Sequence, residues 1–156
     1  MCAKKDKELH ILKGITGYAE SGECLAIMGG SGAGKSTLLN ILAGRFEVES
    51  NMSLEGEVLL NGHKMSWSEY KNIIGFVMQR DIFFESLKVN EIFRLVVDLT
   101  SDDKSNEWKN EFLKDIVKNL KMERAQNTQV GGDLLKGISG GEKRRLNIGF
   151  ELLRKP

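Results

Sequence analysis

The chain has 156 residues, and its 23 Lys and Arg side chains against 22 Asp and Glu leave a formal net charge of +1. A chain of this length forms one domain that buries roughly 70% of its unfolded surface. The balanced charge gives no electrostatic support for non-specific binding to nucleic acid or to an anionic membrane. Glycine is abundant, with 17 residues against one proline, which predicts several tight turns or close backbone approaches.

The two cysteines, Cys2 and Cys24, lie far apart in the sequence, so a disulfide framework is not indicated and a reducing compartment is expected. The N-terminus is charged where a signal peptide would need an apolar segment. No run approaches the roughly 18 apolar residues that a membrane span needs. We therefore expect the 156-residue chain itself to be soluble and cytosolic.

The first part of the chain predicts strands that lead into a glycine-rich loop and a helix. Residues 10–18 are apolar and β-branched, and residues 23–28 form a nearly continuous apolar run, as in a strand buried on both faces of a sheet. Apolar residues at helical spacing follow from 38 to 42, and Gly44 stands where a left-handed cap would end the helix. The predicted order is strand, glycine-rich loop, helix.

Two more strands and two helices are predicted farther along. Residues 57–60 followed by Asn61-Gly62 predict a strand and a hairpin turn, and residues 73–78 predict a buried strand that stops at Gln79. The apolar positions of the two helices are Val89, Ile92, Phe93, Val96 and Val97, then Trp108, Phe112, Leu113, Ile116, Val117 and Leu120. A polar linker, residues 100–106, separates these helices.

The segment ISGGEKRR, residues 138–145, opens the last predicted helix. Ser139 and Glu142 have the spacing of a capping box, so this helix should begin at Gly140 with the positive end of its dipole at the glycines. The basic run 143–145 is interpreted as a solvated helix face, because no aromatic residues interleave with it as they do in single-strand nucleic-acid sites.

The segment GGSGAGKS, residues 29–36, matches the pattern of a phosphate-binding loop. A chance match in a chain of this length is on the order of 1%, which leaves little weight for a plain glycine-rich turn with an exposed lysine. In this pattern backbone N–H groups converge on the β-phosphate at a helix N-terminus. Lys35 supplies a positive charge between the β- and γ-phosphates, and the Ser36 hydroxyl can bind Mg²⁺.

A phosphate-binding loop alone does not distinguish kinases, GTPases, motors and transport ATPases. The chain has no Asn-Lys-x-Asp segment of the kind that reads a guanine base. The segment that begins at Thr100 is acidic and polar, whereas a small-molecule kinase would carry an Arg-rich lid. The glycines of ISGGEKRR are therefore the feature that discriminates.

Three motifs in this order, GGSGAGKS, a glutamine after an apolar run (Gln79) and ISGGEKRR, resemble those of the nucleotide-binding domain of ABC transporters. More narrowly, residues 11–45 and 130–156 resemble the G subfamily, the half-transporters of the White and pleiotropic-drug-resistance type. The resemblance implies an α/β P-loop NTPase core with an N-terminal antiparallel β part and a helical subdomain that carries the signature motif. It implies that residues 1–156 are a C-terminally incomplete domain, with 1–80 as β part and P-loop core and 81–156 as helical subdomain.

The resemblance also implies roles for single residues. The nucleotide-binding Walker A motif and its continuation match Gly29, Gly30, Ser31, Gly32, Ala33, Gly34, Lys35, Ser36 and Thr37. Lys35 and Gln79 match catalytic positions, Ser36 and Gln79 match positions that contact Mg²⁺, and ATP is the implied nucleotide. The signature motif, which meets ATP bound by another nucleotide-binding domain, matches Ser139, Gly140, Gly141 and Glu142.

The chain departs from the family pattern in two places. No aromatic residue precedes Ile11, where many ABC domains stack one on adenine, and His10 is a weak substitute. The Walker B carboxylates, the D-loop and the switch His follow the signature helix in the family and lie beyond residue 156. We therefore expect this chain alone to bind nucleotide weakly and to hydrolyse it negligibly. A central sheet without its Walker B strand would expose unpaired backbone and apolar surface, which predicts ready aggregation.

The implied function is the ATP-binding part of a transporter, which couples ATP binding and hydrolysis to transport across a membrane. The implied partners are a second nucleotide-binding domain, identical or different, and a transmembrane domain C-terminal to this segment, with the assembly working at the cytosolic face of a membrane. No nucleic-acid partner is expected. Two alternatives stay open: a soluble ABC ATPase of the DNA-repair or translation type, and a non-catalytic truncated dimerisation module.

Overall fold

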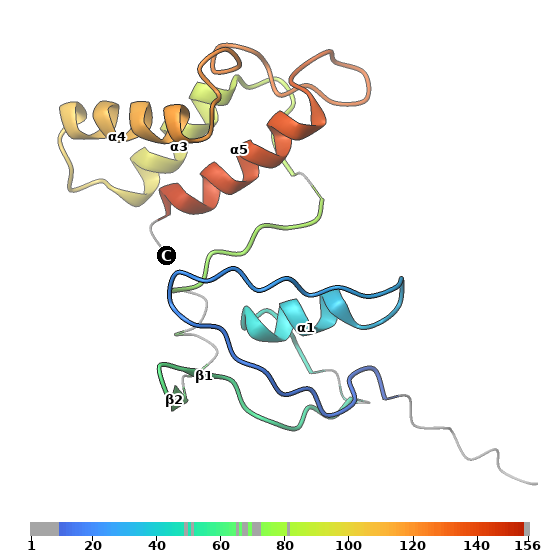
Figure 1. Cartoon of the computed structure of the whole chain (residues 1–156). Helices are drawn as coiled ribbons and strands as arrows, with labels where there is room; N and C mark the ends of the chain where they lie inside the picture. The colour runs from blue at the N-terminus through green and yellow to red at the C-terminus, as the bar shows by residue number, and fades with distance from the viewer. Residues whose placement is uncertain are drawn as a thin grey trace, which may run out of the picture. The chain divides into compact units, whose positions relative to one another are not determined.

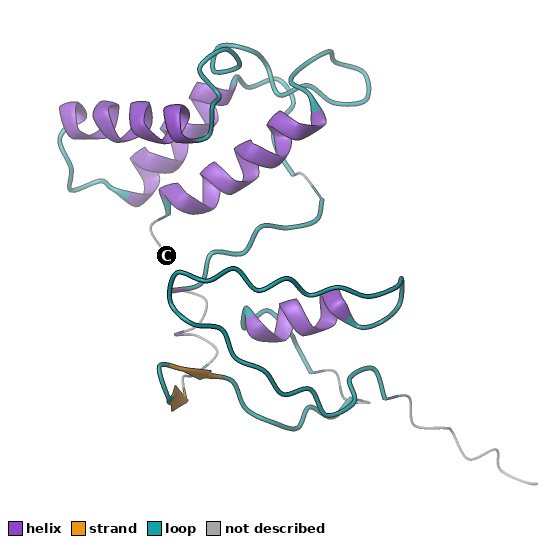
Figure 2. Cartoon of the chain, viewed as in Figure 1, coloured by secondary structure: helices purple, strands orange, loops and turns teal. Residues whose placement is uncertain are grey.

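The computed structural model describes residues 10–48, 50, 52–64, 66, 69, 73–80 and 82–154. The chain forms two compact units, residues 1–71 and residues 72–156. Figure 1 labels the helices and strands along the chain, and Figure 2 distinguishes helix, strand and loop. Within the described residues, none of the helices is both long enough and apolar enough to pass through a bilayer.

Helix α1 (Lys35–Leu42) begins directly after the glycine-rich loop of the first unit. Its apolar side buries Ile41. The helix ends as its sequence predicts, because Gly44 has a φ of 64° and its N–H donates to the Ile41 carbonyl at 3.0 Å. A left-handed residue of this kind satisfies carbonyls that the last helical turn leaves open.

A two-stranded antiparallel hairpin, β1 (Leu59–Leu60) and β2 (His63–Lys64), also belongs to the first unit. Leu59 faces Lys64 and Leu60 faces His63. The turn residues Asn61 and Gly62 have φ values of 51° and 79°, the pair of left-handed conformations that a type I′ hairpin turn requires. The predicted hairpin turn is confirmed.

The strands predicted at residues 10–18 and 23–28 are wrong, because both segments are loop in the structure. An extended segment becomes a strand only when its N–H and C=O groups pair with a neighbour, and no described segment forms a ladder with either of these two. Their apolar side chains are consequently open to solvent, with Leu25 60% and Met28 88% exposed.

Among its described residues, the second unit contains the helices α3 (Val89–Thr100), α4 (Asn106–Asn119) and α5 (Gly140–Leu153). They confirm the helices that apolar spacing and the capping box predict. The most completely buried side chains are Val89, Phe93, Val97, Met122, Val130, Leu146 and Leu153. At Gly149 in α5, an added Cβ would lie only 2.7 Å from the Phe93 ring and 2.6 Å from Leu120 Cδ1. This close approach lets α5 lie directly against α3.

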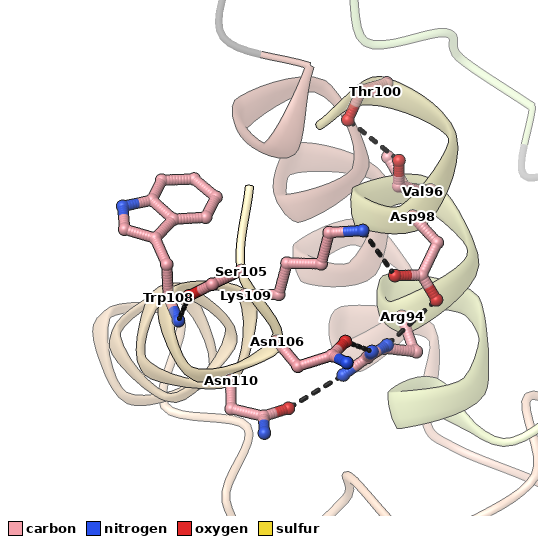
Figure 3. Close-up of polar contacts among 9 residues, drawn as sticks. All are labelled: Arg94, Val96, Asp98, Thr100, Ser105, Asn106, Trp108, Lys109 and Asn110. Carbon is pink, nitrogen blue, oxygen red and sulfur yellow. Dashed lines mark hydrogen bonds and ion pairs between the residues drawn. The ribbon is translucent and has the colours of Figure 1, made fainter. Parts of the chain in front are cut away.

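A group of polar side chains joins α3 to α4 (Figure 3). The Arg94 guanidinium donates to Asp98 at 2.9 Å, to Asn106 Oδ1 at 2.8 Å and to Asn110 Oδ1 at 2.7 Å. Lys109, whose side chain is 9% exposed, donates to the other Asp98 oxygen at 3.2 Å. The hydrogen bond from Arg94, helped by Lys109 and opposed by partial desolvation, lowers the pKa of Asp98. The planar, five-donor guanidinium thus ties three residues of two helices together.

In the loop between α4 and α5, glycines allow two backbone segments to approach each other closely. Gly131 has a φ of 68°, and an added Cβ there would lie 2.5 Å from the Leu135 carbonyl oxygen. An added Cβ at Gly137 would lie 2.2 Å from the Val130 carbonyl oxygen. The Val130 N–H donates to the Leu87 carbonyl at 2.9 Å, which fixes this loop to the segment before α3. The loop is thereby held against the segment that precedes α3.

Candidate nucleotide-binding site

The glycine-rich loop, residues 29–34, takes a shape that side chains would prevent. Gly32 and Gly34 have φ values of 78° and 87°, a region that other L-residues rarely occupy. An added Cβ at Gly34 would also lie 2.9 Å from Leu12 Cδ2 and 3.1 Å from the Ile11 carbonyl oxygen. Conformation and space both require glycine at position 34, whereas the positions of Gly30 and Gly32 are open on their Cβ side.

The N-terminus of α1 carries N–H groups that the helix itself does not use. Its first backbone bond runs from the Leu38 N–H to the Gly34 carbonyl at 2.9 Å, so the N–H groups of residues 35–37 project from the helix end. None of the described side chains caps α1, and its first turn contains no acidic residue. The helix dipole adds partial positive charge at the same end. This end can therefore accept an anion without displacing a side chain.

Lys35 folds back over the loop that precedes it. Its ammonium donates to the Gly29 carbonyl at 2.8 Å and to the Gly30 carbonyl at 2.6 Å, and the Ala33 N–H closes a turn onto Gly30 at 3.3 Å. The positively charged Lys35 ammonium thus lies beside the loop, next to the uncapped N-terminus of α1. The neighbouring Ser36 is exposed.

These features fit a polyphosphate and, with it, a divalent cation. The loop offers backbone donors, a positive charge and room where phosphate oxygens would lie. For Mg²⁺, the chemistry of the donors is suitable but sparse, because Ser36 contributes one hydroxyl and no cluster of three His, Cys, Asp or Glu occurs in the described residues. Mg²⁺ commonly keeps several waters and takes phosphate oxygens as ligands, so its coordination would come mainly from the nucleotide.

A shallow hollow of about 410 Å³ lies beside the loop in the same unit. Its walls are formed by His10, Ile11, Leu12, Lys13, Ile15, Gly32 and Ala33. The structure therefore places His10, the weak substitute for an aromatic residue, next to the glycine-rich loop. Sequence reasoning did not predict that residues 11–13 lie against the loop, since nothing in their spacing indicates this contact.

In the second unit, the residues predicted as the signature motif form the N-terminus of α5. The Ser139 N–H donates to Glu142 Oε2 at 2.8 Å, and the Glu142 N–H donates to Ser139 Oγ at 3.3 Å. This is the predicted capping box. The bonds that the Ser139 N–H and the Ser139 hydroxyl donate to Glu142 Oε2, both at 2.8 Å, lower the pKa of Glu142, and the charge of Arg145 lowers it further. Gly140 and Gly141 are exposed, so the backbone of the first turn is accessible to a large ligand.

Gln79 is exposed and lies at a bend in the second unit, the unit that contains α5. The preceding residues 74–78 are extended loop, so the strand predicted at 73–78 is wrong. Their polar groups meet side chains of α5 in place of a neighbouring strand. The Arg144 guanidinium donates to the Met78 carbonyl, and the Phe76 N–H donates to Glu151 Oε2 at 3.2 Å.

The interpretation of residues 143–145 as a solvated helix face holds for Arg144, which is exposed, but not for Lys143 and Arg145, which are partly buried. Lys143 donates to the Gly131 carbonyl at 2.8 Å, Arg144 to Met78, and the Nε of Arg145 is buried with no hydrogen-bond partner among the described residues. Two of the three basic side chains therefore donate to backbone carbonyls. The sequence offers no local signal for these contacts, since the partners of Arg144 and Glu151 are 66 and 75 residues away.

The glycine-rich loop and the capped glycine helix can be compared with those of known proteins. Residues 12–156 match the family described as ABC transporter. The chain belongs to the ABC transporter family. It is 38% identical over 156 residues to ABC transporter G family member 4 of Dictyostelium discoideum, a match that covers 97% of this chain and 19% of that protein. It is 43% identical over 148 residues to ABC transporter G family member 26 of Arabidopsis thaliana, covering 94% of this chain and 21% of that protein.

The similarity to G family members confirms the resemblance that the motifs predict. A third relative, ABC transporter G family member STR of Medicago truncatula, is 38% identical over 152 residues, with 97% of this chain and 18% of that protein covered. The chain thus spans about a fifth of the length of these relatives. Membership of the ABC transporter family implies a P-loop NTPase fold, which agrees with the loop that precedes α1.

Proposed function

We propose that the chain is the ATP-binding part of a membrane transporter, in which ATP binding and hydrolysis are coupled to transport. The observation that carries the proposal is the phosphate-binding loop. Gly30 and Gly32 leave space above the backbone, the N-terminus of α1 has no side-chain cap, and Lys35 holds a positive charge beside the loop. Family membership supports the same assignment. We further propose one partial nucleotide-binding domain over 1–156, with the P-loop core in 1–80 and the helical signature subdomain in 81–156.

Each proposed role follows from the chemistry of the residue. The N–H groups of the loop and of residues 35–37 bind phosphate oxygens, and Lys35 exchanges its carbonyl acceptors for β- and γ-phosphate oxygens. The Ser36 hydroxyl holds Mg²⁺, which neutralises phosphate charge when it is bound with ATP. Gln79 contacts the metal or the attacking water. The base rests in the hollow between His10 and Ala33.

The signature residues act on a nucleotide that belongs to another domain. Ser139, Gly140 and Gly141 present an accessible helix N-terminus, which suits a γ-phosphate held by the Walker A motif of a second nucleotide-binding domain. Closure of the two domains around ATP would then drive a transmembrane domain at the cytosolic face of a membrane. The soluble-ATPase alternative has no observation in its favour, because the relatives named above are transporters by name. The dimerisation-module alternative predicts a complex with a full-length partner and no ATP dependence.

The test is nucleotide binding by the 156-residue chain with Mg²⁺ present, followed with a fluorescent ATP analogue. Lys35→Ala removes charge-assisted bonds to phosphate and should weaken binding by about tenfold or more. Lys64→Ala, an exposed lysine of β2 in the same unit, is the matched control and should leave binding unchanged. We expect negligible ATP hydrolysis by either variant or by the parent. Equal binding by all three proteins would contradict the proposal.

A further inference from the structure

The chain segments that precede and follow Gln79 both contact α5. On the N-terminal side, Phe76 and Met78 make the hydrogen bonds to Glu151 and Arg144 already described. On the C-terminal side, the ring of Phe83 meets the ring of Phe150 edge to face, with centroids 6.4 Å apart and planes at 61°. Three side chains of one helix therefore contact the segments that flank Gln79.

The spacing of these contacts suits a helix and an extended chain. Arg144 and Glu151 are seven residues apart, close to two helical turns, so they project from the same side of α5. In an extended chain the N–H of one residue and the C=O of the residue two positions on point to the same edge, and Phe76 and Met78 have this relation. Side chains of α5 thus form hydrogen bonds with backbone groups of Phe76 and Met78 that would pair with a neighbouring strand in a sheet.

The chemistry of the contacts favours a stiff attachment. Each of the two hydrogen bonds includes a charged group, and such bonds are roughly twice as strong as neutral ones. The Glu151 side chain is only 14% exposed, so water competes little for its oxygens. Glu151 also accepts from Arg154 at 3.5 Å, which restricts its own rotation.

We propose that Arg144, Glu151 and Phe150 are positioning residues that make Gln79 and the signature helix move as one body. Any displacement of the N-terminus of α5, where Ser139 and the glycines lie, is then carried to Gln79 by the helix itself. The proposal rests on the function proposed above for these two motifs. The proposal gives Arg144 and Glu151 a specific role, which the sequence motifs alone do not predict.

The experiment places one nitroxide label at position 79 of the chain, in a Cys2→Ser, Cys24→Ser, Gln79→Cys background, and records its mobility by electron paramagnetic resonance. Arg144→Ala and Glu151→Ala should each convert a broad, restricted line shape into a narrow, mobile one. Arg144→Lys and Glu151→Gln keep a donor and an acceptor and should preserve the restricted line shape. Glu111→Ala and Lys114→Ala, on the exposed face of α4, are the matched controls and should change nothing.

A second readout in the unlabelled chain is the exchange rate of the Phe76 amide, measured by NMR. Loss of the bond to Glu151 should speed this exchange about tenfold in Glu151→Ala relative to Glu111→Ala. Far-UV circular dichroism checks that each variant keeps its helices. If Glu151→Ala loses its helical signal, Arg144→Ala and Phe150→Leu carry the test, because they touch the segment at other points.

Restricted line shapes in all folded variants would overturn the proposal. Binding of the fluorescent ATP analogue, measured on the same set together with Lys35→Ala, separates this result from a failure of the proposed function. If Lys35→Ala weakens binding but the label never becomes mobile, only the positioning role is wrong. If Lys35→Ala binds as well as the parent, the nucleotide assignment itself is wrong.

Discussion

The two units carry their motifs by different means. The hydrogen bonds within the glycine-rich loop are short-range, since Lys35 reaches back five and six positions to Gly30 and Gly29, although Gly34 also lies close to Ile11 and Leu12. Nearby apolar side chains such as Met28 remain exposed. The signature helix instead lies in a packed core in which Phe93, Leu146 and Leu153 are completely buried. A short motif can thus take its shape locally, but the orientation of a helix that carries a motif depends on packing across the chain.

The largest effect is expected when the close contact at Gly149 is disturbed, which tests whether the second unit depends on packing while the loop does not. Gly149→Leu would force a side chain into space occupied by Phe93 and Leu120, and overpacking of this kind costs about 1–3 kcal/mol or more. We expect the second unit to unfold at clearly lower denaturant concentration, as followed by far-UV circular dichroism. ATP-analogue binding at the loop should change much less. Equal loss of both would show that the two units depend on one another.

Removal of the Ser139 side chain gives a smaller effect of the same kind. Ser139→Ala abolishes one half of the capping box, and the loss of such a cap costs about 1 kcal/mol. The change should appear as a modest decrease in the denaturation midpoint of the helical unit. Ser139→Asn, which can also cap a helix, is the control and should recover most of the loss. A midpoint unchanged in Ser139→Ala would mean that the cap adds no stability.

Acid should weaken the second unit through carboxylates that include those of Asp98 and Glu142. The pKa values of Asp98 and Glu142 are lowered in the folded chain, chiefly by Arg94 and Ser139 respectively. A lowered pKa contributes stability that is present above the unfolded values, about 3.9 for Asp and 4.3 for Glu, and is lost as pH falls through the folded values. Stability should therefore be flat above about pH 5 and decline below it.

The matched variant for this pH dependence is Asp98→Asn, measured by denaturant titrations between pH 3 and 7. It keeps an acceptor for Arg94 but does not titrate, so its stability should decline less on acidification than that of the parent. Identical profiles would exclude Asp98 as a contributor.

The smallest effect is expected in the first unit. Met28→Gln replaces a side chain that is 88% exposed, and surface substitutions of this kind usually change stability by less than about 0.5 kcal/mol. We expect the midpoint of unfolding to stay unchanged while solubility, measured by light scattering, improves. A large loss of stability would show that Met28 is buried in solution, and would remove the contrast between the units.

The helices and turns could be predicted from the sequence because they are determined locally. The cap at Gly44, the Asn61-Gly62 turn and the Ser139–Glu142 box each depend on residues within three or four positions of one another. The strands at 10–18, 23–28 and 73–78 were predicted incorrectly, because an apolar run does not specify a hydrogen-bonding partner. The contacts of Arg144 and Glu151 could not be predicted, since they join residues 66 and 75 positions apart.

The ammonium of Lys35 has a structural task before any phosphate arrives. It bridges the carbonyls of Gly29 and Gly30, which supports the curved shape of the loop. In the function proposed above, nucleotide binding would exchange these carbonyl acceptors for phosphate oxygens. Replacing this lysine with a neutral residue would therefore make the nucleotide-free loop less ordered, and it would also reduce the affinity for nucleotide. The loop is kept ready for its ligand by the same charge that would hold the ligand in place.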